Sequence, residues 1–339
     1  MEQPGAEWDA FVAGEPEATL AHAAAWARVM REAYGVEPHY LAARESGALA
    51  GVLPLVRVPT LRGGAELVSM PYLDTGGILG RDERAVASLF ASARARTEAS
   101  GARALELRQA APLPGIEPGP PPDRVNLVLP LAADEEALWA ALPATVRNQT
   151  RKARREGLSP WVAGEEACDA FYAPFRENMR DLGTPVHSRG FYRAAARAFG
   201  ASLRFVIARD GERPVGGLVA IHTGHRVTVP WASTLRAERR RCPNNLIYWE
   251  ALRWAVSRGA RSFDFGRSPR NSGTHRFKRG WGARDEPLHW LRCTPTGDRL
   301  PFTPPGDDPL LRTFSRLWTR LPLSVTDRLG PPLRKRISS

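Results

Sequence analysis

The segment 263–283, FDFGRSPRNSGTHRFKRGWGA, places a lysine and several aromatic residues in a glycine-containing basic stretch. Lys278 is one of only three lysines among the 48 basic residues, the others being Lys152 and Lys335. In a chain that otherwise uses arginine, a lysine indicates a place where a compact ammonium is needed. Beside a reacting carbonyl, an ammonium stabilises the negative charge that develops on the oxygen. We therefore predict a catalytic Lys278, with the adjacent Phe277 in the same site; a solvated surface lysine is the alternative.

The residues before this lysine form a predicted strand and a loop. Residues 261–265, RSFDF, place Phe263 and Phe265 on one face of a strand and Asp264 on the other. Ligands of α/β sheets favour the ends of such strands, where backbone N–H groups of a Gly/Ser loop can hold an anion. If the lysine segment is also extended, Phe277 and Lys278 face opposite sides. The predicted substrate-binding residues here are Asp264, Gly266, Arg267, Ser268 and Arg276; an ordinary flexible loop is the alternative.

A second candidate is the basic segment 147–155, RNQTRKARR, with five cations in nine residues. On a helix, Arg147, Arg151 and either Arg154 or Arg155 share one face. Arginine is suited to bidentate phosphate contacts, so this face could bind phosphates or nucleic acid. The predicted binding residues are Arg147, Asn148, Arg151 and Lys152, and a solvated helix face is the alternative. Asp134 is the expected N-cap of the helix that precedes this segment.

Composition limits the class of protein. The 339 residues carry a net charge of +12 with a pI of about 10.5, which favours anionic partners. Three cysteines lie far apart and the histidines lack metal spacing, so we expect no metal, no disulfide framework and no cofactor. The acidic N-terminus has no apolar core, and no run of about 18 apolar residues occurs. These features predict a cytoplasmic protein.

Two parts of the sequence repeat one pattern. YLAARESGALAGVLPL from Tyr40 matches FVIARDGERPVGGLVAI from Phe205, and both predict a β-hairpin. Further along, LVSMPYLDTGG matches RVTVPWASTLR, so that Pro71-Tyr72 aligns with Pro230-Trp231. A predicted helix follows in each part, and then GARALELR or GARSFDFGR. The order and spacing predict a tandem duplication of one α/β unit with mixed sheets.

The expected domains follow from this duplication. Residues 1–132 form the first domain, with a proline-rich loop at 111–123 and its last strand beginning at Asn126, and residues 133–300 form the second. Residues 301–339 form a basic tail in which apolar residues share one helical stripe and Arg312, Arg316 and Arg320 another. Such a helix can lie on an anionic membrane or pack on the first domain, and we expect the latter.

The duplicated unit resembles the Gcn5-related N-acetyltransferase (GNAT) fold. The segments FDFGRS, SGTHRFKRGWGA, RNQTRKARREGL and VSMPYLDTGGIL are together similar to the FemAB family of aminoacyl transferases, and most similar to its Gram-negative FemAB-like branch. The likeness spans nearly the whole chain. It implies two tandem GNAT-like domains and transfer of an amino acid from aminoacyl-tRNA to an amine of a cell-wall or other phosphorylated or lipid-linked envelope precursor.

The resemblance also implies roles for individual residues. Lys278 would stabilise the tetrahedral oxyanion, Phe277 would lie beside the aminoacyl-adenosine end, and the helix at 147–155 would face substrate phosphates. Three further residues are predicted to bind substrate: Tyr72 and Asp74 in the segment VSMPYLDTGGIL, and Trp231, which aligns with Tyr72 in the internal repeat. The loop expected to bind the CoA diphosphate in an acetyltransferase, LRAERRRCPNN from Leu235, has no glycine, and Pro243 has no N–H to donate. This departure argues against acetyl-CoA as the donor.

Two other functions remain open from the sequence. One is an N-acyltransferase that uses CoA or an acyl carrier. The other is a non-catalytic binding protein of envelope assembly, peripheral to the inner membrane and held on anionic lipid by its tail. No nucleophilic serine or cysteine motif is present, so a covalent enzyme intermediate is not expected.

Overall fold

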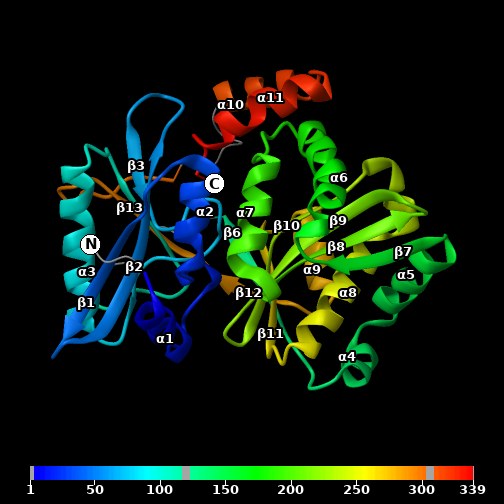
Figure 1. Cartoon of the computed structure of the whole chain (residues 1–339), viewed down its shortest axis with the longest axis horizontal. Coiled ribbons are helices and arrows are strands. Elements are labelled where there is room, and N and C mark those ends of the chain that lie inside the picture. The colour runs from blue at the N-terminus through cyan, green and yellow to red at the C-terminus, as the bar shows by residue number, and fades with distance from the viewer. Residues whose placement is uncertain (1–3, 117–122, 303–308, 339) are drawn as a thin grey trace. The chain divides into compact units, whose positions relative to one another are not determined.

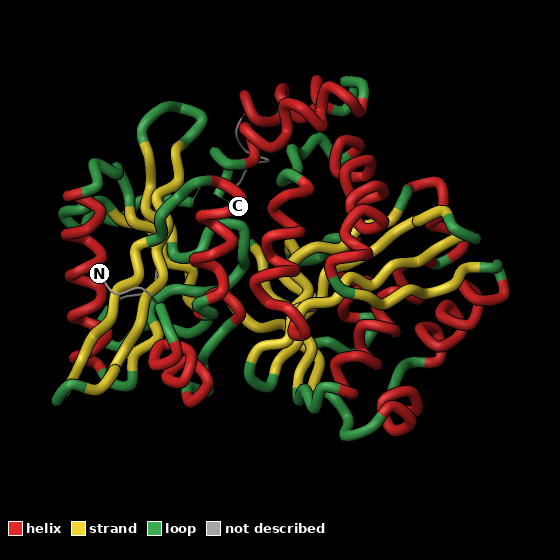
Figure 2. The backbone as a smooth tube through the Cα atoms, viewed as in Figure 1, coloured by secondary structure: helices red, strands yellow, loops and turns green. Residues whose placement is uncertain are grey.

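The computed structural model of the chain describes residues 4–116, 123–302 and 309–338, and its strands form two sheets (Figures 1 and 2). By their contacts, the described residues divide into two units. The first unit contains the residues up to Val125, then 287–302 and 332–338. The second contains 126–286 and 309–331.

The first sheet has the strand order β1-β2-β3-β5-β13, with β4 paired to β2. Its strands are β1 (His39–Glu45), β2 (Ala48–Pro59), β3 (Ala65–Val68), β4 (Leu79–Gly80), β5 (Leu105–Gln109) and β13 (His289–Cys293). The helices of this unit are α1 (Ala6–Gly14), the 3₁₀ turn η1 (Leu20–His22), α2 (Ala25–Tyr34) and α3 (Glu83–Ala99).

The second sheet has the order β12-β6-β11-β10-β9-β8-β7. Its strands are β6 (Arg124–Pro130), β7 (Leu158–Ala163), β8 (Leu203–Asp210), β9 (Arg213–Thr223), β10 (Arg226–Thr234), β11 (Ser262–Pro269) and β12 (Arg284–Pro287). The helices that precede the tail in this unit are α4 (Glu135–Ala141), α5 (Ala144–Arg155), α6 (Cys168–Asp181), α7 (Arg189–Phe199), α8 (Pro243–Ser257) and α9 (Gly273–Arg279). Short 3₁₀ turns are η2 (Glu165–Ala167), η3 (Gly200–Ser202) and η4 (Arg236–Arg241).

The predicted duplication is present in the pairing of the strands. In the first unit β1–β2 and β2–β3 are antiparallel and β3–β5 is parallel. In the second unit β8–β9 and β9–β10 are antiparallel and β10–β11 is parallel. Each parallel pair is bridged by a helix, α3 or α8, as the repeat predicted. The mixed α/β fold class with two tandem GNAT-like domains is confirmed by this topology and by the structural comparisons given below.

The core of the first unit lies on both faces of its sheet. On one face of β2, Leu53 and Leu55 belong to the apolar cluster under α3. On the opposite face, Val52 belongs to a second cluster with Trp8 and Tyr40. Because neighbouring side chains of a strand point to opposite faces, a strand that is buried on both sides has an almost continuous apolar sequence. Asp82 is the N-cap of α3, and its carboxylate accepts from the Ala85 N–H at 2.7 Å.

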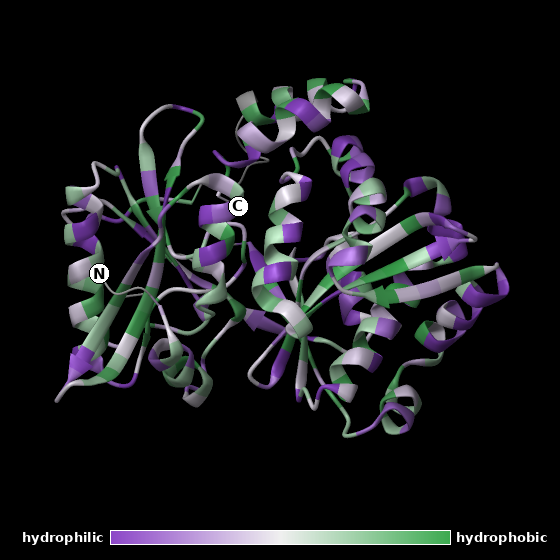
Figure 3. Ribbon diagram, viewed as in Figure 1, coloured by the Kyte–Doolittle hydropathy of each residue, from purple (hydrophilic) through white to green (hydrophobic). Residues whose placement is uncertain are grey.

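The second sheet is also covered on both faces. Helices α6 and α7 pack on one face and α8 on the other, with α4 and α5 against α8 (Figure 1). The apolar strands β8 and β9 lie between these layers (Figure 3). Gly217 in β9 permits a close approach of α6, because a Cβ there would lie 2.8 Å from Ile207 Cδ1 and 3.3 Å from Phe171. Asp134 caps α4 as predicted, accepting from the Ala137 N–H at 2.8 Å.

A buried histidine makes the first unit sensitive to acid. His22 Nδ1 accepts from the Thr19 N–H at 3.0 Å and Nε2 lies 3.2 Å from Gly77 O, which fits a neutral ring protonated on Nε2. Burial lowers the pKa of His22 from 6.5 to about 4. Between these values the unfolded chain binds the proton and the folded chain does not, so stability is lost as the pH falls from about 6.5 to about 4.

The expected loss from this group alone is about 3 kcal/mol. It can be measured as the difference in urea unfolding between pH 7 and pH 4. A His22→Gln variant should lose less stability over the same range, because it has no group that titrates there. An equal pH dependence in both proteins would contradict this assignment.

The domain boundaries differ from those expected. The strand at Asn126, assigned from sequence to the first domain, lies in the second sheet as β6, beside β11. Conversely, β13 follows the second unit in sequence but pairs antiparallel with β5 of the first, from His289↔Gln109 to Cys293↔Leu105. Neighbouring strands are joined by hydrogen bonds between backbone groups, which every sequence has. The apolar pattern of a strand therefore does not specify which sheet the strand joins. Of the proline-rich loop, residues 117–122 lie outside the described residues.

The tail also differs from its expected position. It forms α10 (Pro309–Trp318) and α11 (Leu323–Arg334), and residues 309–331 group with the second unit; only 332–338 group with the first. A Cβ on Gly183, after α6, would lie 2.7 Å from Ser315 O, so glycine lets α10 approach. Arg176 of α6 pairs with Asp327 of α11. No helix in the described part of the chain is long and apolar enough to cross a membrane.

Candidate active site at the end of strand β11

The parallel pairing of β10 with β11 stops in the middle of both strands. The paired residues of the two strands run from Arg226↔Ser262 to Thr228↔Asp264. Strand β10 then has a register irregularity and continues to Thr234 in pairing with β9, while β11 continues to Pro269. The two strands therefore separate just beyond Asp264, and the predicted site residues of β11 lie on this separated part.

Lys278 is buried there, but on a helix rather than an extended segment. Helix α9 begins after Ser272, whose hydroxyl accepts from the His275 N–H at 3.1 Å, so the segment expected as a strand is helical. Lys278 is 8% exposed. Its Nζ donates to Gly266 O at 2.8 Å and to Arg267 O at 3.0 Å. The ammonium is thus held at the carbonyls of β11 just beyond its last pair with β10.

Asp264 is the buried acid of this site, at 3% exposure. Its Oδ1 accepts from the Gly266 N–H at 2.8 Å and its Oδ2 from Asn126 Nδ2 of β6 at 3.1 Å. Gly266 has a φ of +75°, a conformation that strains any residue with a side chain. This bend directs the carboxylate to its own strand's amide and directs Gly266 O to Lys278.

Two serines lie on the separated ends of the strands. Ser268 is 1% exposed and Ser233 of β10 is 5% exposed. Within the described part of the chain, neither hydroxyl has a hydrogen-bond partner. Buried polar groups without a partner are rare, so these hydroxyls are suited to a substrate that enters between the strands.

The aromatic residues of the motif form the wall behind the lysine. Phe277 is half-buried, 5.5 Å from Tyr248 of α8 and 6.2 Å from Trp281 between ring centroids. Trp281 is 1% exposed and packs with Phe265 and Tyr248, so it belongs to the core. Burial raises the pKa of Tyr248, which keeps its hydroxyl neutral.

The outer face of α9 is tied to β12. Asp285 lies 3.1 Å from His275 Nε2 and accepts from Arg270 and Arg279 at 3.2 and 3.4 Å. Arg276, predicted to bind substrate, is exposed and donates to Asn271 O at 2.7 Å. These contacts fix the orientation of the helix that carries Lys278.

The remaining predicted substrate residues lie elsewhere. Trp231 of β10 is buried in an aromatic group with His187, Phe191 and Tyr192. Tyr72 and Asp74 belong to the first unit. Tyr72 is 8% exposed, its hydroxyl donates to Lys335 O at 3.2 Å, and burial raises its pKa to about 12. The Asp74 carbonyl accepts from Trp290 Nε1 at 3.0 Å.

The position equivalent to the lysine site is filled in the first unit. In the repeat, Glu106 and Arg108 align with Asp264 and Gly266. Arg108 is fully buried, donates through Nε to Glu106 at 2.8 Å and through Nη1 to Leu73 O at 2.7 Å, and covers the Trp290 ring at 4.6 Å. Where the second unit has a bare glycine, the first has an arginine side chain, so the two copies have diverged at this point.

The basic helix exists as predicted and is α5. Arg151 and Arg154 line a cavity of about 530 Å³ between α4, α5 and α8. Asn148 Oδ1 lies 3.4 Å from Arg151 Nη1, whereas Arg147, Asn148 and Lys152 are not among the residues lining the cavity. The cavity shares no lining residue with the Lys278 site, so the second unit has two separate candidate sites.

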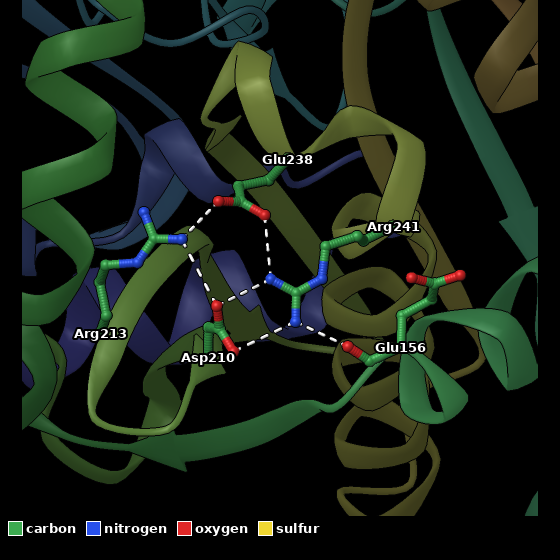
Figure 4. Close-up of polar contacts among 5 residues, drawn as sticks. All are labelled: Glu156, Asp210, Arg213, Glu238 and Arg241. Atoms are coloured by element: carbon green, nitrogen blue, oxygen red, sulfur yellow. Dashed lines mark hydrogen bonds and ion pairs between the residues drawn. The ribbon is translucent and has the colours of Figure 1, made fainter.

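The start of α8 is occupied by a group of ion pairs (Figure 4). Arg241 donates to Asp210 at 2.8 and 3.1 Å, to Glu238 at 3.1 Å and to Glu156 O at 2.6 Å, and Arg213 pairs with both Asp210 and Glu238. The hydrogen bond from Arg241 lowers the pKa of Asp210, and that from Arg213 lowers the pKa of Glu238. Cys242 precedes the helix with a φ of +59°, and Pro243 is its first residue. Carboxylates and a proline at this position disfavour a bound diphosphate.

Several residues of both sites escaped sequence analysis. Asn126 interrupts an apolar strand, which was a detectable signal, but its partner Asp264 is 138 residues away. Ser233 and the cavity residues Trp139 and Trp249 lie in ordinary polar or apolar patterns. Only the packing of α4 and α5 on α8 brings the latter together.

The comparisons agree with this architecture. Residues 142–279 match the family model described as acetyltransferase (GNAT) domain. A crystal structure of FemX is similar with a TM-score of 0.66, 14% identity, and coverage of 93% of this chain and 99% of that one. No curated protein matches this chain in sequence.

Two further structures share the fold. The C-terminal domain of a putative lysylphosphatidylglycerol synthetase from Agrobacterium fabrum has a TM-score of 0.54 at 16% identity, covering 78% of this chain and 86% of that one. A tandem GNAT protein from the clavulanic acid biosynthesis pathway has a TM-score of 0.50 at 13% identity, covering 88% and 94%. Residues 142–279 thus match the GNAT-domain model, and the chain has the fold of tandem GNAT-like proteins.

Proposed function

We propose that this protein is a FemAB-type acyltransferase that transfers an amino acid from aminoacyl-tRNA to an amine of a cell-envelope precursor. The observation that carries the proposal is the buried ammonium of Lys278, held at the carbonyls of Gly266 and Arg267 where β10 and β11 separate. The hydroxyls of Ser233 and Ser268, which have no hydrogen-bond partner among the residues that the structure describes, add donors for a substrate on the separated parts of the two strands.

In the proposed reaction, the acceptor amine attacks the carbonyl carbon of the aminoacyl ester. A C–N bond forms, the carbonyl oxygen becomes an oxyanion, and the ester C–O bond to the ribose then breaks. The amine proton ends on the released ribose hydroxyl, so no group remains on the protein. Lys278 stabilises the oxyanion. Asp264 and Gly266 position the strand end at which the lysine is held.

Two of the three cysteines, Cys168 and Cys293, are poorly suited to form an acyl-enzyme, which supports a direct transfer. Burial raises the pKa of Cys168 to about 12 and also raises the pKa of Cys293. A protonated buried thiol is a poor nucleophile. Binding and orientation of the two substrates then supply most of the rate enhancement.

The ion pairs at the start of α8 support a donor other than CoA. Arg241 is already bonded to Asp210 and Glu238, so a diphosphate would have to displace two carboxylates. One protein with a similar fold, a putative lysylphosphatidylglycerol synthetase, is named for a lysyl ester of a phospholipid. That name agrees with the proposal, but the argument from this site does not depend on it.

A CoA- or carrier-dependent N-acyltransferase is the second candidate, favoured by the match of residues 142–279 to the GNAT acetyltransferase model. Calorimetry separates the two: tight CoA binding would favour the second candidate. For the first, we expect amide products, detected by mass spectrometry, when the protein is incubated with charged tRNAs and candidate amine acceptors. Its binding to tRNA should weaken by orders of magnitude from about 50 to 200 mM salt. No tRNA binding at low salt would exclude this donor.

We further propose a peripheral membrane location for the acceptor step. Arg312 and Arg316 on α10, and Arg320 just after it, are exposed, and within the described residues none of them makes an ion pair. Three exposed leucines lie on the same tail or beside it: Leu182, Leu317 and Leu329. Cations with exposed apolar side chains suit an anionic lipid surface. Co-sedimentation with phosphatidylglycerol vesicles, absent with phosphatidylcholine vesicles, is the expected result.

A further inference from the structure

The cavity between α4, α5 and α8 is distinct from the lysine site and has its own chemistry. Its volume of about 530 Å³ lies in the range of small-ligand pockets. Two indoles, three guanidinium groups, two carboxylates and one threonine line it: Trp139, Trp249, Arg151, Arg154, Arg253, Glu135, Glu136 and Thr150.

The apolar wall of the cavity is aromatic. The rings of Trp139 and Trp249 lie 4.6 Å apart between centroids, at 58° to each other. Trp249 is 5% exposed and Trp139 is half-buried, so the accessible indole surface of the cavity belongs mainly to Trp139. Indole surfaces of this kind bind flat rings such as nucleobases, because each base has a π face.

The three arginines of the cavity are not equivalent. Arg154 donates to Glu250 at 2.6 Å, and Arg253 donates to Glu135 at 2.6 Å and to Glu250 at 2.9 Å. Arg151 instead lies over the Trp139 ring at 5.3 Å and donates to the Asn148 amide oxygen at 3.4 Å. It has no carboxylate partner among the described residues. Its guanidinium is therefore held by an aromatic ring while its charge is available for a phosphate.

The carboxylates also differ. Glu135 is neutralised by Arg253, whereas Glu136 is exposed and has no hydrogen bond or ion pair within the described residues. A carboxylate at the edge of an aromatic cavity can accept from an exocyclic amino group of a base. The cavity thus offers an indole surface and, among the described residues that line it, a cation and an acceptor without an ionic partner.

We infer that this cavity binds a single nucleotide, with the base against Trp139 and Trp249, the phosphate on Arg151 and an exocyclic amine on Glu136. The nucleotide can be free or part of an unpaired nucleic-acid strand. If the proposed tRNA donor is correct, an unpaired nucleotide of that RNA would be the natural occupant, and to that extent the inference deepens the proposed function. Nucleotide binding can nevertheless be measured without any transfer reaction.

The experiment is calorimetry of the full chain at about 50 mM salt with CMP, UMP, ribose 5-phosphate, a single-stranded RNA hexamer and the same hexamer in a duplex. We expect CMP and the single strand to bind, UMP more weakly, and ribose 5-phosphate and the duplex least. Binding of the single strand well above CMP would identify RNA as the source, and equal binding would identify the free nucleotide.

Variants test the assignment of each group. Trp139→Ala and Arg151→Ala should each weaken CMP binding by about 10- to 100-fold, whereas Trp139→Phe, which keeps a ring, should retain most of it. Glu136→Gln should reduce the preference for CMP over UMP. Trp161→Ala is the matched control, because Arg209 covers that indole at the same 5.3 Å outside the cavity; it should bind as the parent does.

The inference is overturned if no nucleotide binds, if ribose 5-phosphate binds as well as CMP, or if Trp139→Ala and Arg151→Ala bind as the parent does. Thermal unfolding of each variant confirms that it is folded. Amide transfer from charged tRNA is measured separately. Transfer without nucleotide binding would contradict the proposed role of the cavity but not the proposed function. Nucleotide binding without transfer would contradict the proposed function but not the role of the cavity.

Discussion

Replacing Lys278 by methionine is expected to lower kcat for amide transfer by about 10²- to 10³-fold, the usual effect of removing one oxyanion donor. Methionine keeps an unbranched apolar side chain but has no ammonium. The charge on the carbonyl oxygen exists only in the transition state and intermediate, so the loss should fall on kcat with little change in KM. Steady-state kinetics with a charged tRNA and a fixed acceptor amine measure both.

Two further variants separate catalysis from structure. Lys278→Arg keeps a charge with a different shape and should recover only part of the rate. Lys335 provides the matched control, because its Nζ also donates to a backbone carbonyl, Tyr34 O, at 2.7 Å. Lys335→Met should leave the transfer rate near that of the parent. A folded Lys278→Met protein with the parental kcat would refute the catalytic role.

The largest expected effect on stability comes from the buried pair in the first unit. Arg108→Met should lower the free energy of unfolding by about 3–5 kcal/mol, because it leaves the Glu106 carboxylate buried without its guanidinium partner. The substitution also removes the hydrogen bond from Arg108 to Leu73 O and the contact of its guanidinium with Trp290. Urea unfolding of the parent and the variant measures the difference.

A second substitution should reverse much of this loss. Glu106→Gln combined with Arg108→Met removes both charges, so the double variant should be more stable than Arg108→Met alone. The exposed pair Arg31–Glu37, with side chains 38% and 60% exposed, is the control: Arg31→Met should cost at most about 1 kcal/mol. Equal losses for Arg31→Met and Arg108→Met would contradict the importance of burial.

Much of the molecule was predictable because its signals are local. The hairpins at Tyr40 and Phe205 have the apolar alternation and turn residues of paired strands, and their repetition predicted two related units. Asp134 was predicted as a cap from its own neighbourhood. Lys278 was selected because lysine is rare in this chain, and its burial agrees with a specific role.

Other features depended on contacts between distant parts of the chain. Ser272 is a typical N-cap and could have predicted the helix that carries Lys278. The neighbouring glycines suited a loop equally well, and the helix is stabilised by its packing on β11. The cavity of Trp139 and Trp249 exists only because α4 and α8, about a hundred residues apart, pack together. No periodicity in either helix indicates its partner.

By itself, the sequence determined the two-fold repeat and the strand that carries Asp264, because the residues that signal each of them are neighbours in the chain; the catalytic role of Lys278 stays a prediction. Only the tertiary structure decided that β6 and β13 lie in the sheets that they do, that Arg108 fills the place equivalent to Gly266, and that the tail lies mostly with the second unit. The physical reason is that strand edges and helix faces accept many partners, and the backbone hydrogen bonds and close packing that select one are formed only in the folded chain.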